Sequence, residues 1–80
     1  MQQDTAWKVI QVAFRCGGEL QQLLRLLKES CTADEYRNLA SGIATAVDSI
    51  NVQLTDRVLK LHPELRDKID SDLAKFGRIS

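Results

Sequence analysis

Helical periodicity is the feature that most constrains what this chain can fold into. Polar residues recur every three or four positions from Lys8 to Glu29, and apolar residues fill the opposite side of the same turns. This pattern predicts an amphipathic helix over about residues 4–30. A second apolar stripe runs from Tyr36 to Leu61 at a spacing near 3.6 residues, which predicts a helix over about 33–61.

The few helix-breaking and capping residues stand between and after these stripes. Thr32 followed by Glu35 matches a capping box, in which each side chain accepts a hydrogen bond from a backbone N–H at the start of a helix. Pro63 disfavours helical geometry in the residue before it and suits the first turn of a new helix. We therefore expect a third helix over about 63–76, with Gly77 as its C-terminal cap.

The predicted fold class is all-α, a single domain over residues 1–80. Because the turn near residues 31 and 32 is short, the two long helices are expected to fold back as an antiparallel hairpin. Facing residues then have numbers that sum to about 63, so Gly17 meets Ala46 and Cys16 meets Val47. Apolar residues face apolar residues throughout this register, and Cys16 is expected to be buried.

The Gly17–Gly18 pair allows two interpretations. Glycine inside a helix costs about 1 kcal/mol relative to alanine, so the pair requires a structural reason. One reason is close approach of the second helix at Gly17, and the other is a kink that splits the first helix. We favour the continuous helix and keep the kink as the alternative.

The third helix is too short to cover the hairpin. About 14 residues span about 21 Å, whereas each long helix spans about 40 Å. We expect it to cover the end that holds Trp7, Phe14 and Leu54, and to bring Phe76 to the aromatic residues there as core or around a small pocket. The apolar residues left at the other end form the predicted interface: Leu20, Leu23, Leu24, Leu26, Leu27, Leu39 and Ile43.

These uncovered residues predict association with a partner. Fully burying a leucine is worth about 1.5–3 kcal/mol, and exposed apolar patches usually mark interfaces. A chain of 80 residues also has a thin core of its own. We therefore predict a homodimer in which two hairpin ends form a helical bundle, and a helix-in-groove contact with another protein as a further association.

Charge argues against a nucleic-acid footprint. Eleven basic residues balance eleven acidic residues, and no third of the chain is polarised. A small regulatory protein linked to nucleic acid stays as the alternative function. The helices on either side of Pro63 loosely suggest a helix-turn-helix, but alternating charges follow the junction where a basic recognition face would be needed.

No catalytic, cofactor or metal site is expected, so an enzyme ranks below both other functions. His62 is the only histidine and lacks the close spacing to Cys16 and Cys31 that a zinc site needs. We interpret it as a junction residue beside Pro63. Cys31, in the turn, is expected to be the more exposed thiol. The aspartates between residues 67 and 72 alternate with basic residues, as on a solvated face.

No membrane segment is expected either. The first residues, MQQDTAWK, lack a basic region, and charged and polar residues interrupt the apolar stretch that follows them. Neither a signal peptide nor a membrane span is predicted, and the expected location is the cytoplasm.

Overall fold

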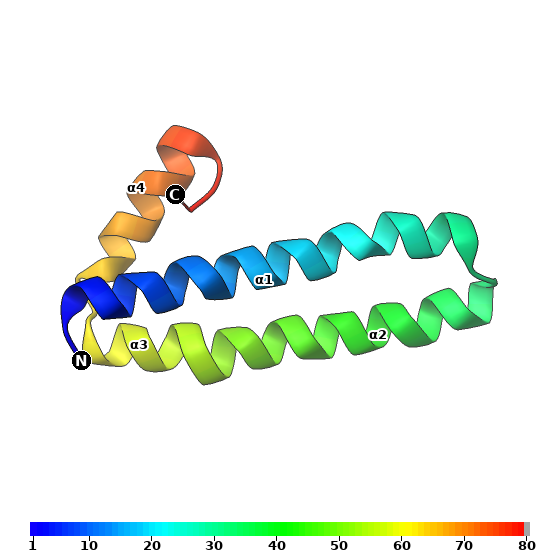
Figure 1. The fold of residues 1–80 in the computed structure, drawn as a ribbon, viewed down its shortest axis with the longest axis horizontal. Helices are drawn as coiled ribbons and strands as arrows, with labels where there is room; N and C mark the ends of the chain where they lie inside the picture. Colours follow the sequence, from blue (N-terminus) through cyan, green and yellow to red (C-terminus); the bar gives the residue numbers. More distant parts are fainter. Residues whose placement is uncertain (80) are drawn as a thin grey trace.

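The computed structural model describes residues 1–79 and is built from helices alone (Figure 1). In chain order these are α1 (Gln3–Ser30), α2 (Ala33–Ile50), the π-helical segment η1 (Asn51–Thr55), α3 (Asp56–Leu61) and α4 (Leu65–Phe76). No strand occurs within residues 1–79, so the predicted all-α class is confirmed. α2, η1 and α3 follow one another without a break and form one rod, which runs beside α1 in the opposite direction (Figure 1).

α1 is continuous through Gly17 and Gly18, so the kinked alternative is wrong. A methyl group added at Gly17 would lie 3.9 Å from Val47 Cγ1, and one added at Gly18 would meet nothing within 4 Å. Because 3.9 Å is an ordinary van der Waals separation, α2 does not approach so closely that only glycine fits. The two glycines are tolerated in the helix, and neither is required by its neighbours.

Burial along α1 corrects the predicted position of Cys16. Gly17 is buried, while Cys16 is exposed, which contradicts its predicted place in the apolar interface. Successive residues of a helix are turned by about 100° from one another. When Gly17 faces α2, Cys16 is therefore turned toward solvent.

The start of α2 forms as its sequence predicts. The Thr32 backbone N–H donates to Glu35 Oε1 at 2.9 Å, and the Glu35 backbone N–H donates to Thr32 Oγ1 at 3.2 Å. These two hydrogen bonds confirm the capping box. They satisfy two backbone N–H groups that the first turn of α2 would otherwise leave without a partner.

The π-helical segment η1 is the feature of this rod that periodicity does not predict. A π turn holds one more residue than an α turn and so rotates the residues that follow it. Thr55 is buried at 6% exposure, and its Oγ1 has no hydrogen-bond partner within the described residues. Leu54, expected in the core, is instead 44% exposed. The rotation at η1 explains why a polar residue is inside and its apolar neighbour outside.

α4 begins at Leu65, two residues later than predicted, because residues 63 and 64 form a turn. It ends as predicted at Gly77, whose φ of 69° is left-handed and whose N–H donates to the Leu73 carbonyl at 2.9 Å. Leu65 and Ile69, in the first half of α4, are buried. The rest of α4 leads away from the other helices (Figure 1). The core cluster lies at this end of the molecule: Ala6, Trp7, Ile10, Val58, Leu59, Leu65 and Ile69.

The second half of α4 does not join this core. Phe76 is 59% exposed, so its predicted meeting with Trp7 and Phe14 is wrong. Phe14 packs at the edge of the core, and the Lys68 ammonium lies 4.4 Å from the centroid of the Trp7 ring. This cation–π contact joins α4 to α1. Lys68, and not Phe76, is thus the residue of α4 that lies against the Trp7 ring.

Candidate association surface

The leucine tip is the set of seven apolar residues predicted as an interface: Leu20, Leu23, Leu24, Leu26, Leu27, Leu39 and Ile43. Leu23, Leu26 and Leu39 are 43%, 56% and 48% exposed. The other four are half-buried, and none of the seven belongs to the core cluster. The structure thus brings these residues to the half of the molecule that is distant from α4 (Figure 1).

Helical spacing divides the leucine tip into two parts. Leu20, Leu24 and Leu27 follow one another at steps of four and three, so they share the side of α1 that meets α2. Leu23 and Leu26 fall outside this stripe, which accounts for their greater exposure. The half-buried residues hold the two rods together, while the exposed leucines form an edge beside them.

Within residues 1–79, no third layer covers this half of the molecule. The buried residues of α1 end at Gly17, and α2 contains no buried residue along its whole length. α4 places its two buried residues, Leu65 and Ile69, in the core at the other end. The pair formed by the second half of α1 and by α2 is therefore held by partly buried contacts alone.

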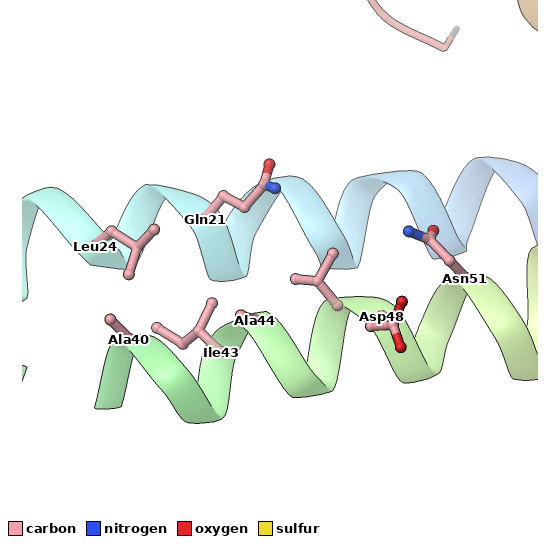
Figure 2. A pocket seen from close by; sticks show the side chains of 8 residues that line it. Gln21, Leu24, Ala40, Ile43, Ala44, Asp48 and Asn51 are labelled. Atoms are coloured by element: carbon pink, nitrogen blue, oxygen red, sulfur yellow. The ribbon is translucent and has the colours of Figure 1, made fainter. Parts of the chain in front are cut away.

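A groove follows the seam between α1 and α2 on one side. It consists of two adjoining hollows of about 330 and 520 Å³ that share Ala40. Figure 2 shows the inner hollow, with Leu24 and Ile43 on opposite walls and Asp48 and Asn51 at one end. We call this the seam groove. Its lining residues are Gln21, Leu24, Lys28, Cys31, Thr32, Ala33, Tyr36, Arg37, Ala40, Ile43, Ala44, Val47, Asp48 and Asn51.

The ends of the seam groove differ in charge. Lys28 and Arg37 line the hollow next to the turn, and Asp48 lines the inner hollow. Arg37 Nη1 lies 3.6 Å from Asp34 Oδ1, but both side chains are largely exposed, so this ion pair holds Arg37 only weakly. The groove thus has a basic end and an acidic end, with apolar side chains such as Leu24 and Ile43 between them.

The seam groove was not predicted from the sequence, although two of its residues, Leu24 and Ile43, were predicted in the interface. The available signal is the alanines at positions 33, 40 and 44, spaced along one side of α2. Alanine is common in any helix, so this spacing gains meaning only when α1 is seen beside it.

The residues considered for chemistry do not converge. His62 lies at the junction before α4, and Cys31 lies at the turn at the far end of the molecule (Figure 1). Within residues 1–79 no group of three His, Cys, Asp or Glu side chains is placed to hold a metal ion. Cys31 is half-buried whereas Cys16 is exposed, which reverses the predicted order.

His62 has a structural role at its junction. Its Nε2 lies 2.9 Å from the Met1 carbonyl oxygen and its Nδ1 lies 3.0 Å from Glu64 Oε1. Gln3 Nε2 also reaches Glu64 Oε1, at 3.5 Å. A backbone hydrogen bond to its carboxylate, followed by the bond from His62, lowers the pKa of Glu64. These contacts fix the start of α1 to the α3–α4 junction.

Among the described residues, no helix has the length and apolar character that crossing a membrane requires. Comparisons with protein-family models, with curated proteins and with solved structures find no match for this chain.

Proposed function

We propose that this protein acts by association and that its first partner is a second copy of the same chain, joined through the leucine tip. The observation that carries the proposal is the exposure of Leu23, Leu26 and Leu39 beside a helix pair that no third layer covers. Exposed apolar side chains that gather on one surface often mark interfaces. Another protein that presents an apolar helix face is the alternative occupant of the same surface.

The free energy of burying the exposed leucines indicates how large the dimer interface must be. Completing the burial of a half-exposed leucine is worth about 1 kcal/mol, so the three exposed leucines of each copy together supply about 6 kcal/mol. Association costs about 4–15 kcal/mol in lost motional freedom. The exposed edge alone therefore gives weak binding at best, and a stable dimer must also bury the half-buried residues around it.

A two-fold arrangement satisfies this requirement. If two leucine tips pack about a two-fold axis, the second half of α1 and the whole of α2 from each copy make a four-helix bundle. The same patch is then used on both copies, so the assembly closes at two subunits. Each α4 lies outside this four-helix bundle and flanks it.

Sedimentation equilibrium on the whole chain at micromolar concentration tests the proposal. Wild type should be a dimer, and Leu26→Glu should weaken it by at least about tenfold, which corresponds to about 1.4 kcal/mol. Circular dichroism should show the helicity of the variant unchanged, since Leu26 is 56% exposed. Leu26 is a better choice than Leu24, which is half-buried in the seam and contributes to the fold itself.

Leu61→Glu is the matched control, because Leu61 is 64% exposed but lies on α3, at the opposite end of the molecule from the leucine tip. It should leave dimerisation unchanged. A monomeric wild type at these concentrations, or equal loss of dimer in the Leu61 and Leu26 variants, would contradict the proposal.

A further inference from the structure

Cys16 is an exposed residue on the same side of α1 as Leu23. The two are seven residues apart, and seven residues of a helix bring a side chain back to within about 20° of the same direction. Each directly precedes a residue that points toward α2, since Cys16 precedes the buried Gly17 and Leu23 precedes the half-buried Leu24. Cys16 and Leu23 are therefore both turned about 100° from the direction of α2, to one side of the helix pair.

α2 has a matching pair of residues on that side. Ala46 directly precedes Val47, which points toward α1, and Leu39 lies seven residues before Ala46. Because α1 and α2 are antiparallel right-handed helices, the residue before an inward-facing one is turned to the same side of the pair on both. Cys16, Leu23, Leu39 and Ala46 thus share one surface. We call the surface formed by these four residues the leucine side.

The seam groove and α4 lie on the other side of the helix pair. The groove residues Lys28 and Asp48 each follow a residue of the seam, so they are turned away from the leucine side. Trp7 follows the buried Ala6 and is turned the same way, and the Lys68 ammonium of α4 lies 4.4 Å from its ring centroid. Within residues 1–79, α4 therefore leaves the leucine side uncovered.

The leucine side differs from the groove in charge. Its four residues are all uncharged, whereas the seam groove has a basic end and an acidic end. The charged residues of α1 nearest to Cys16 in the chain, Arg15 and Glu19, are turned further from α2 than Cys16 is. They lie where the rim of an interface would be. A largely uncharged centre with a polar rim is the usual anatomy of a protein interface.

We propose that the homodimer interface extends from the leucine tip along the leucine side to Cys16 and Ala46, so that Cys16 is exposed in one chain and buried between two. A second copy is the occupant because this surface continues the one that joins the proposed homodimer, and because the exposed leucines alone give weak binding. The extension adds about one helical turn, or about 6 Å, of each helix to the contact. This inference rests on the proposed homodimer and names a further residue that it buries.

Labelling of the two native cysteines tests whether the dimer buries Cys16. Maleimide rates are measured on the whole chain at protein concentrations well below and well above the dissociation constant that sedimentation equilibrium gives. At the higher concentration the Cys16 rate should fall by at least about tenfold, because mass action leaves few chains without a partner. The Cys31 rate should not change, since Cys31 lines the groove on the other side. Leu26→Glu should keep Cys16 reactive at both concentrations.

A pair of substitutions tests the same surface by affinity. Cys16→Glu should raise the dissociation constant by at least about tenfold, because it places an unpaired charge inside the interface. Ala44→Glu is the matched control, since Ala44 is a small exposed residue that lines the seam groove, and it should leave the dimer unchanged. Circular dichroism should show both variants folded, because both positions are exposed in one chain.

The outcomes separate this inference from the proposed function. If Leu26→Glu disrupts the dimer while Cys16 reacts equally fast in monomer and dimer, the homodimer stands and the extension to Cys16 is wrong. Wild-type affinity in Cys16→Glu, or equal weakening by Ala44→Glu, would also contradict the extension. A monomeric wild type overturns both proposals.

Discussion

His62 Nδ1 lies 3.0 Å from Glu64 Oε1, while the other ring nitrogen of His62 lies 2.9 Å from the Met1 carbonyl oxygen. Both partners are acceptors. A neutral imidazole has one N–H and can donate to only one of them, whereas the imidazolium donates to both. The His62 ring thus links the Met1 carbonyl to the Glu64 carboxylate at the α3–α4 junction.

The Glu64 carboxylate makes the stability of the fold depend on pH. Its pKa is lowered in the folded chain, so its ionised form stabilises the fold at pH above the ordinary value of 4.5, and this contribution is lost as the pH falls through the lowered pKa. Thermal unfolding followed by circular dichroism should show a midpoint that falls below this pH more steeply in wild type than in Glu64→Gln. Parallel curves for the two proteins would contradict the assignment.

Thr55→Val should stabilise the protein. The Thr55 hydroxyl is buried without a hydrogen-bond partner within the described residues, and valine has the same shape. Removing such a group relieves a desolvation cost of about 1–2 kcal/mol. Urea unfolding measures the change, and Thr45→Val, at an exposed position of α2, should alter stability by less than about 0.5 kcal/mol. A loss of stability in Thr55→Val would mean that the hydroxyl has a partner in solution.

Gly18→Ala should stabilise α1 by about 0.5–1 kcal/mol, because alanine restricts the unfolded chain and the added methyl group meets nothing within 4 Å. Gly77→Ala should have the opposite effect, since Gly77 has a φ of 69° that other residues adopt only with strain. Chemical unfolding of the two variants compares them directly. A destabilised Gly18→Ala would show that α1 needs flexibility at this point.

Cys16 should react with a thiol reagent faster than Cys31. Cys16 is exposed on α1, whereas Cys31 is half-buried at the turn. Labelling with a maleimide at low protein concentration, followed by peptide mass analysis, gives the two rates, and the unfolded chain in urea supplies the reference for each site. Faster labelling of Cys31 would show that Cys31 is the more accessible thiol, as the sequence predicted.

What the sequence by itself determined is the local structure. The capping box of Thr32 and Glu35, the end of α4 at Gly77 and the two long helical spans all form where the pattern predicts them. Each depends on hydrogen bonds or periodicity within a few residues, so the information is contained in a short stretch of chain. The length of α4 is also set by its sequence and leaves the leucine tip uncovered, while the role of that tip as an interface stays a prediction.

Only the tertiary structure decided which side of each helix faces inward and where α4 points. Neighbouring residues of a helix are turned by about 100° from one another, so Cys16 faces solvent where Gly17 faces α2, and the π turn at η1 leaves Leu54 exposed. The direction of α4 depends on how Leu65 and Ile69 fit the distant core residues of α1 and α3. Periodicity counts residues along one helix, and it carries no information about the rotation or crossing of two helices, which the packing of residues far apart in the chain determines.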